Sequence, residues 1–310
     1  MQRTALFDVA LALSVLAACS DDDVSTSGSG GASTVSHSAT GGGDATSTAS
    51  TGGGGAAPSC DVNEIPLIVS SSGGVPDRFH VPVRFQGQDA ALLFDTGSAL
   101  TFVLLGDGAP GYVPDAGVLE IGCDAISVPG RGGLADLGEE EGLPVIGILG
   151  VDYVAAGTTL VDHDAELLVR HPSGTALPGT DTWAELPYED VEGYMIAPVE
   201  LDASAVRLMF DTGAPHILWL GEEGQPGDQE VMTTDAEGNV LTLYYGDVML
   251  GMAGEPVHQV PVLRAPSFPY FEDTVAALGG NIHGLLGLTA LEGRRFVVDG
   301  AAGALLIEPR

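Results

Sequence analysis

The sequence predicts an all-β protein of two similar lobes with pseudo-twofold symmetry, and three observations lead to this class. The chain contains two copies of one unit. Its apolar runs are short, rich in β-branched residues, and separated by Gly, Pro and Asp. Helical periodicity is scarce, and we expect short helical turns only at VDYVAAG (151–157) and LTALEG (288–293).

The repeat becomes visible when the chain is compared with itself. At a shift of 116 residues, VPVRFQGQDAALLFDTGSALTFVL (81–104) aligns with APVELDASAVRLMFDTGAPHILWL (197–220) without a gap. At a shift of 137 residues, GILGVDYVAAGTTLVDHDAELLVRHP (147–172) aligns with GLLGLTALEGRRFVVDGAAGALLIEP (284–309). The second unit is therefore about 21 residues longer in its middle. We place the two lobes at residues 59–176 and 177–310.

Each unit offers several short candidate strands. In the first unit they include VPVRF (81–85), ALLF (91–94), VLEIG (118–122) and ELLVRH (166–171). In the second unit, two apolar runs flank Asp-Ala-Glu-Gly-Asn within VMTTDAEGNVLTLYY (231–245). This pattern predicts a β-hairpin with its tip at residues 235–239.

The N-terminal residues 1–19 are typical of an export signal. Arg3 precedes a mostly apolar stretch that ends in Leu16-Ala17-Ala18-Cys19. This ending resembles the bacterial lipobox, which implies cleavage before Cys19 and lipid attachment to it; the alternative is an ordinary signal peptide in which Cys19 is incidental. Residues 20–58 are almost wholly Gly, Ser, Thr, Ala and Asp, too polar to form a core. We therefore expect an exported cell-envelope lipoprotein whose folded body is joined to a membrane by a disordered tether.

Composition narrows the range of partners and cofactors. The formal charge is −33, with 43 acidic residues and 10 basic ones, all of them Arg. This balance argues against a nucleic-acid partner, because phosphate binding requires a basic surface. The histidines show no ligand spacing such as His-Glu-x-x-His, so we expect neither a metal nor another cofactor.

Two cysteines remain if Cys19 carries a lipid. Cys60 and Cys123 would then form an even pair in an oxidising compartment, where a disulfide between them can form. Two free buried thiols are the alternative, because the sequence gives no distance between them.

The most informative motif is an Asp-Thr-Gly triplet that occurs once in each unit. The first copy is Phe94-Asp95-Thr96-Gly97-Ser98 and the second is Phe210-Asp211-Thr212-Gly213-Ala214. Each copy is followed by an apolar-apolar-Gly element, Ile148-Leu149-Gly150 and Leu285-Leu286-Gly287. This pair of motifs resembles the aspartic peptidases, and the resemblance covers residues 62–310. It implies the bilobal pepsin-like or retropepsin-like fold, with Asp95 and Asp211 as the catalytic pair.

The chemistry of that family explains why two aspartates are needed. Two carboxylates about 3 Å apart repel each other by roughly 5 kcal/mol at an effective dielectric constant near 20. The pair therefore keeps one proton and titrates as a unit, as is established for the dyad of this family. A water between the carboxyl groups loses a proton to the ionised member and attacks the peptide carbonyl.

The resemblance also implies roles for the neighbouring residues. Gly97 and Gly213 allow the two loops to approach closely. Thr96 and Thr212 are expected to form hydrogen bonds across the lobe interface. Ser98 is a candidate to orient Asp95, and Ala214 cannot do the same for Asp211.

Peptidases of this family cover the substrate with β-hairpin flaps. The hairpin at 231–245 is the candidate flap of the second unit. The first unit has only residues 105–117 in the corresponding interval, rich in Gly and Pro, so its flap is expected to be short or absent. Residues 59–78 are a candidate propeptide by position alone.

The sequence thus predicts an aspartic endopeptidase that acts on peptides or unfolded proteins. Both motifs lie in one chain, so a monomer is expected to suffice. The alternatives are a catalytically inactive lipoprotein that uses the same cleft to bind peptides, and a structural spacer of the cell envelope.

Overall fold

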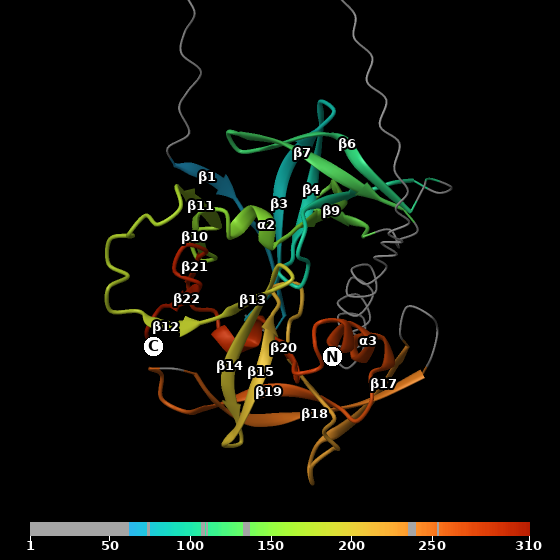
Figure 1. The fold of residues 1–310 in the computed structure, drawn as a ribbon, viewed down its shortest axis with the longest axis vertical. Coiled ribbons are helices and arrows are strands. Elements are labelled where there is room, and N and C mark those ends of the chain that lie inside the picture. The colour runs from blue at the N-terminus through green and yellow to red at the C-terminus, as the bar shows by residue number, and fades with distance from the viewer. Residues whose placement is uncertain are drawn as a thin grey trace, which may run out of the picture. The chain divides into compact units, whose positions relative to one another are not determined.

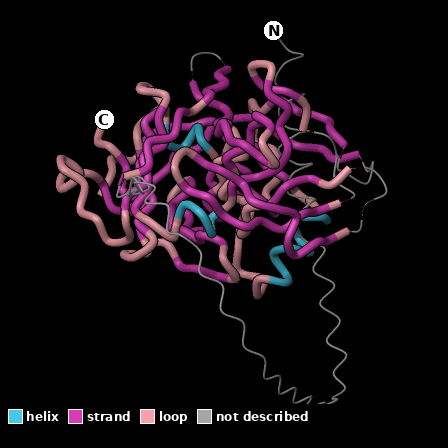
Figure 2. The backbone as a smooth tube through the Cα atoms, turned by 90° about the horizontal axis from the view of Figure 1, so that it is seen from above, coloured by secondary structure: helices cyan, strands magenta, loops and turns pink. Residues whose placement is uncertain are grey.

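The computed structural model describes residues 62–72, 75–106, 109, 111–132, 137–234, 240–252 and 254–310 (Figure 1). The predicted signal peptide, the predicted tether, Cys19, Cys60 and the hairpin tip at 235–239 lie outside these residues. Strands dominate the described part of the chain, which confirms the all-β class (Figure 2). None of its helices is both long enough and apolar enough to cross a membrane.

The strands form two eight-stranded sheets and one six-stranded sheet. The first eight-stranded sheet contains β2 (Ile68–Ser72), β3 (Val75–Phe85), β4 (Gln88–Phe94), β9 (Leu143–Leu149), β5 (Phe102–Leu104), β7 (Asp124–Arg131) and β6 (Tyr112–Ile121), with β8 (Glu139–Glu140) paired to β9. The second contains β13 (Glu189–Val191), β14 (Tyr194–Leu201), β15 (Ser204–Phe210), β20 (Gly284–Leu286), β16 (Ile217–Leu220), β19 (His258–Ala265), β18 (Val240–Gly251) and β17 (Gln229–Thr234).

The pairing pattern of the first sheet recurs in the second. Strand β4 is parallel to β9, and β15 is parallel to β20 in the same way. Strand β5 is parallel to β7, and β16 is parallel to β19. The repeat seen in the sequence is therefore also a repeat of strand topology. The predicted lobe boundary at 176/177 falls between β11 and β12, and we call the parts before and after it the first and second halves.

The six-stranded sheet combines strands from both halves. Its order is β1 (Asn63–Pro66), β11 (Leu167–His171), β10 (Thr158–Asp162), β21 (Phe296–Asp299), β22 (Ala304–Ile307) and β12 (Ala184–Pro187), and the labels run in this order in Figure 1. The halves meet where β10 pairs with β21, with Leu160 opposite Val297. Phe296 of β21 and Phe210 of β15 pack edge to face, with their ring centroids 5.6 Å apart, within one apolar core.

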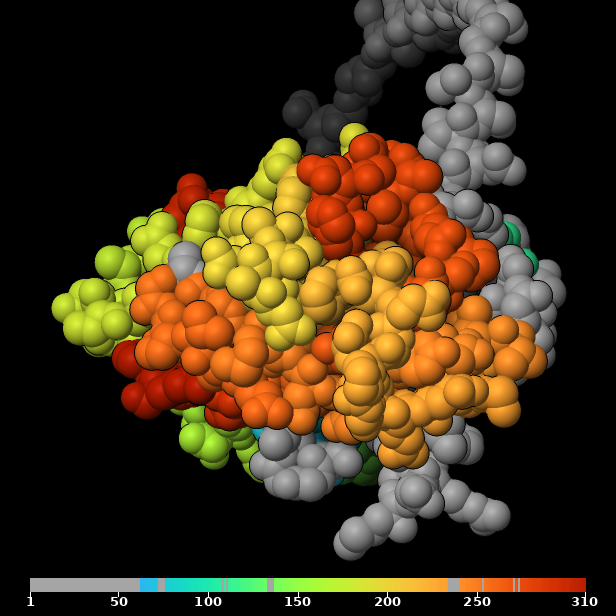
Figure 3. Space-filling model, turned by 90° about the horizontal axis from the view of Figure 1, so that it is seen from below, coloured from blue at the N-terminus to red at the C-terminus, as the bar shows by residue number. Residues whose placement is uncertain are grey.

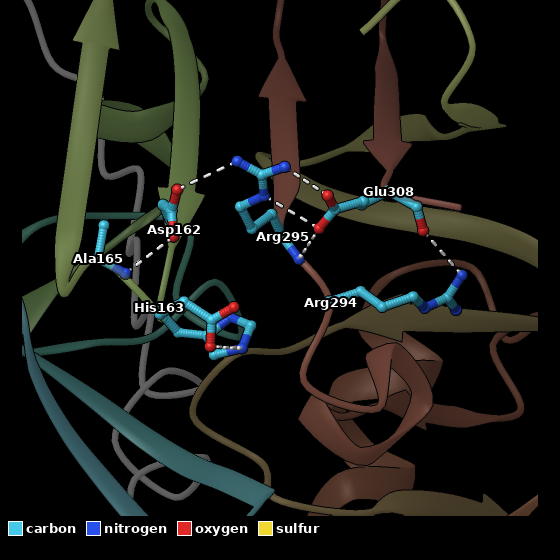
Figure 4. Close-up of polar contacts among 7 residues, drawn as sticks. Asp162, His163, Ala165, Arg294, Arg295 and Glu308 are labelled. Carbon is cyan, nitrogen blue, oxygen red and sulfur yellow. Dashed lines mark hydrogen bonds and ion pairs between the residues drawn. The ribbon is translucent and has the colours of Figure 1, made fainter. Parts of the chain in front are cut away.

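A polar link reinforces the junction between β10 and β21 (Figure 4). The Arg295 guanidinium lies 3.3 Å from Asp162 of the first half and donates a hydrogen bond to Glu308 at 3.0 Å. Arg294 donates to the Glu308 carbonyl oxygen at 3.2 Å. One guanidinium thus connects the end of β10 to the end of β22.

Three helical segments occur among the described residues, and one of them was not expected from the sequence. The expected turns are α2 (Val151–Val154) and the 3-10 helix η1 (Leu288–Leu291). The third, α3 (Pro269–Ala277), corrects our expectation that helices occur only at those two places. Proline at its first position and a hydrogen bond from the Phe268 N–H to the Glu272 carboxylate (2.8 Å) start this helix. Together with β17, it accounts for much of the extra length of the second unit.

Within the candidate propeptide 59–78, the described residues 62–72 and 75–78 belong to the fold of this chain. Strand β1 forms an edge of the shared sheet, and Ile65 is fully buried. The Asn63 amide donates to the Ile121 carbonyl oxygen at 2.9 Å and accepts from the Cys123 N–H at 3.0 Å. Removing these described residues would expose core and leave backbone groups unpaired, and the propeptide stays a prediction.

Cys123 is disulfide-bonded. Its partner lies outside the described residues, and so do the two other cysteines of the chain. The alternative of a free thiol at Cys123 is therefore wrong, and its pairing with Cys60 stays a prediction.

Two buried histidines should make the fold less stable in acid. His80 and His258 are buried, and burial lowers the pKa of both imidazoles. As pH falls below about 6.5, the unfolded chain takes up protons that the folded chain does not, so the free energy of unfolding decreases. We expect His80→Gln to flatten the dependence of the melting temperature on pH between about pH 7.5 and 5. An unchanged slope in this variant would contradict the prediction.

Candidate active site

The two Asp-Thr-Gly loops begin at equivalent places in the two sheets. Asp95 directly follows β4 and its N–H donates to the Leu149 carbonyl oxygen at 3.1 Å. Asp211 directly follows β15 and its N–H donates to the Leu286 carbonyl oxygen, also at 3.1 Å. Each apolar-apolar-Gly element thus fixes the start of one loop, because its strand runs parallel beside the strand that carries the aspartate. The flanking Ile148 and Leu285 are buried, and Gly150 and Gly287 pass beneath the loops.

Four hydrogen bonds that involve the hydroxyls of Thr96 and Thr212 hold the loops together. The Thr96 hydroxyl donates to the Phe210 carbonyl oxygen at 2.9 Å and accepts from the Thr212 N–H at 3.0 Å. The Thr212 hydroxyl makes the reciprocal pair with the Phe94 carbonyl oxygen (2.9 Å) and the Thr96 N–H (3.0 Å). Both threonines are fully buried, so these bonds are shielded from competing water.

Replacing Thr212 with valine should weaken both folding and the geometry of the site. Valine keeps the shape but leaves the Phe94 carbonyl and the Thr96 N–H buried without partners, which costs about 2 kcal/mol or more. We expect a lower unfolding midpoint in urea with an unchanged m-value. Thr289→Ala is a suitable control, because the Thr289 hydroxyl is buried and has no hydrogen-bond partner. Equal stability of the two variants would refute the role of these bonds.

The two carboxyl groups lie in contact, each against the glycine of the opposite loop. A Cβ atom placed on Gly97 would lie 2.6 Å from Asp211 Cγ, and one on Gly213 would lie 2.5 Å from Asp95 Cγ. Only glycine leaves room for this approach. The side chains of Asp95 and Asp211 hydrogen-bond to each other, and both are almost completely buried.

The surroundings of the two aspartates differ. Asp95 Oδ1 accepts from the Gly97 N–H at 2.8 Å, whereas Asp211 Oδ1 accepts from both the Gly213 N–H (2.8 Å) and the Ala214 N–H (3.1 Å). The Ser98 hydroxyl donates to the Leu100 carbonyl oxygen at 2.8 Å. This corrects the expectation that Ser98 orients Asp95, because its single proton is directed elsewhere.

These surroundings also affect the pKa values of the two carboxyl groups differently. Burial, and then the adjacent Asp211 carboxylate, raise the pKa of Asp95 well above its usual value. Burial raises the pKa of Asp211 as well, but the hydrogen bond from Asp95 and the N–H groups of Gly213 and Ala214 oppose this rise. Both shifts favour retention of a proton by the pair at a pH where isolated carboxyl groups are ionised.

The predicted hairpin of the second half is confirmed and lies beside the Asp211 loop. Strands β17 and β18 pair along the whole length of β17. The inner side chains Leu241 and Leu243 share a buried cluster with Ala214, Phe268 and Phe271, so the hairpin, the loop and the α3 segment pack together. Figure 3 shows this region as adjoining orange and orange-red surfaces. In the first half, no strand stands between β5 and β6 in the described part of the chain.

Arg264 of β19 fixes the base of this hairpin. It is 2 % exposed and donates to the Asp228 carboxylate and to the Asp247 carbonyl oxygen, both at 2.8 Å. Asp228 directly precedes β17 and Asp247 belongs to β18. At the same end of the hairpin, the rings of Tyr245 and His216 meet at 5.5 Å, and His216 belongs to the loop that follows Asp211.

Two further features lie away from the aspartates. Cavities of about 590 and 600 Å³ occur in the second half; Trp183 lines the first, His283 the second, and Glu255 both. Neither cavity includes Asp95 or Asp211.

Over the described ranges, His, Cys, Asp and Glu side chains form no group of three that could hold a metal ion.

Comparison with known proteins adds little to this geometry. No protein-family model matches the chain, and no characterised protein sequence matches it. Among solved structures, the basic 7S globulin from soybean aligns over 79 % of this chain and 94 % of its own, with 10 % sequence identity and a TM-score of 0.44. A likeness this weak bears on neither the fold family nor the function.

Proposed function

We propose that this chain is an aspartic endopeptidase with the bilobal fold of that family, and that it hydrolyses peptide bonds with a water activated between Asp95 and Asp211. One observation carries the proposal. Two buried carboxyl groups, 116 residues apart, meet on loops with the same Asp-Thr-Gly sequence, and each accepts a hydrogen bond from the glycine N–H of its own loop. Two adjacent buried carboxyl groups would be costly in a purely structural role, because burial without full compensation destabilises the folded state.

Because the two aspartates accept different numbers of backbone hydrogen bonds, we assign them different roles in proton transfer. Ionised Asp211, which accepts more backbone N–H donors, takes a proton from the attacking water. Protonated Asp95 donates a hydrogen bond to the carbonyl oxygen of the substrate and stabilises the tetrahedral intermediate. A proton then passes to the leaving nitrogen as the C–N bond breaks, which frees a carboxyl and an amino terminus.

The β17–β18 hairpin is the proposed cover of the substrate. It packs on the Asp211 loop and has no counterpart between β5 and β6 among the described residues. Cover from the second half alone would leave the first-half side of the cleft more open.

The cellular setting is a further part of the proposal. The Leu-Ala-Ala-Cys sequence at 16–19 supports export and lipid attachment at Cys19, and the polar segment 20–58 supports a tether. The substrates would then be peptides or unfolded proteins that reach the cell envelope.

The decisive experiment is incubation of the folded protein with unfolded casein from about pH 3 to 7, with and without a statine-type inhibitor. Fragments that disappear with the inhibitor support the peptidase. Binding of casein without fragments at any pH would instead favour a peptide-binding lipoprotein, and neither cleavage nor binding would favour a structural spacer.

A further inference from the structure

The loop that follows Asp95 is fastened by two side chains that sequence reasoning did not single out. The Thr101 N–H and hydroxyl both donate to Asp152 Oδ1, at 2.8 and 2.6 Å. The same hydroxyl accepts from the Gly150 N–H at 3.0 Å. Thr101 is 1 % exposed, whereas Asp152 lies at the surface, so the bonds to Asp152 are partly buried and the Gly150 bond is fully buried.

Backbone hydrogen bonds hold the loop after the aspartate in both halves. The N–H groups of Val151 and Asp152 donate to the carbonyl oxygens of Ser98 and Ala99, at 2.9 and 3.2 Å. The equivalent bonds in the second half run from Leu288 and Thr289 to Ala214 and Pro215, both at 2.9 Å.

The hydrogen bonds between the Thr101 and Asp152 side chains have no equivalent in the second half. The repeat places Ile217 opposite Thr101 and Thr289 opposite Asp152. Isoleucine offers no hydroxyl, and the Thr289 hydroxyl is buried without a hydrogen-bond partner. The Asp95 loop is therefore held by a carboxylate-centred network that the Asp211 loop lacks.

The fastened segment begins next to the groups that contact the carboxyl pair. Gly97 donates to Asp95 and lies against Asp211, and the next residue, Ser98, is held by Val151. A shift of residues 98–101 would therefore move the Gly97 N–H relative to both carboxyl groups. A misplacement of about 1 Å is enough to slow a reaction by about 100-fold.

We propose that Asp152 is a positioning residue that acts through Thr101 to hold the Asp95 loop in its reactive geometry. Its catalytic consequence rests on the proposed function, whereas the fastening itself does not. Asp152→Ala should lower kcat by about 10- to 100-fold, and Asp152→Asn, which keeps the accepting oxygen, should recover most of this loss. Thr101→Val should have a similar effect to Asp152→Ala, and the double variant should be no slower than the single ones.

Hydrogen exchange tests the fastening without reference to cleavage. In Asp152→Ala, the amides of residues 98–101 should exchange about 10-fold faster or more than in the wild type, while those of residues 214–217 stay unchanged. Thr289→Ala, the matched change in the second half, should alter neither segment nor kcat.

Two results would overturn the proposal. The first is wild-type exchange at residues 98–101 in Asp152→Ala. The second is wild-type cleavage by Asp152→Ala under conditions where Asp95→Asn is inactive. If the wild-type protein does not cleave at all, the peptidase proposal fails by itself, and the exchange comparison still decides whether Asp152 fastens the loop.

Discussion

Cleavage of casein should be abolished when either Asp95 or Asp211 is replaced by asparagine. Asparagine keeps the shape and can hydrogen-bond, but it can neither take a proton from water nor pass one to the leaving nitrogen. The expected fall in kcat/KM reaches the detection limit in both variants, as measured by release of peptide fragments. Cleavage at the wild-type rate by either purified variant would refute the proposed dyad.

Loss of activity in these variants should not come from unfolding. The pKa of each carboxyl is raised in the folded state, so above about pH 4 the folded chain binds more protons than the unfolded chain. This difference lowers the stability of the wild type as pH rises above about 4. Asp95→Asn and Asp211→Asn remove it and should melt at or above the wild-type temperature at pH 7. Asp89→Asn is the control for replacing a carboxylate with an amide, because the Asp89 side chain on β4 is exposed.

Removing Asp228 should destabilise the protein by up to about 3–5 kcal/mol, because the buried Arg264 guanidinium loses its carboxylate partner at 2.8 Å and keeps only the half-exposed Asp202 at 3.7 Å. Urea unfolding of Asp228→Ala measures the loss. The hairpin base should also loosen, because Asp228 precedes β17 directly, and we expect a higher KM for peptide substrates.

Two comparisons sharpen this test. Asp89→Ala breaks the pair between Arg84 and Asp89, whose side chains are 57 % and 77 % exposed, and should cost less than about 1 kcal/mol. The double variant Asp228→Ala/Arg264→Met should recover much of the lost stability, since no unpaired charge remains in the core. If it were as unstable as Asp228→Ala alone, the lost charge pairing of Arg264 would not be the cause.

The repeated motif made the central part of the candidate site predictable from the sequence. Phe94 and Phe210 occupy equivalent positions, so the residues after them had to leave equivalent strands. The hairpin at 231–245 was equally visible, because its two apolar runs flank a turn sequence.

Other features depend on partners that are distant along the chain. Thr101 and Asp152 lie 51 residues apart in the sequence. The second half has no equivalent pair, so comparing the two repeats could not predict this contact. Arg264 looks like a surface residue in the sequence, and only tertiary packing brings Asp228 to it. The helix α3 is short and weakly amphipathic, so its proline and glutamate signals were outweighed by the β-rich pattern around it.

The pairing of β10 with β21 has a consequence for how the site assembles. Separated from each other, the two halves would each present an unsatisfied strand edge, and their association would depend on protein concentration. In a single polypeptide, each edge meets its complement at an effective concentration on the order of millimolar. Dilution of the protein therefore does not separate the carboxyl pair.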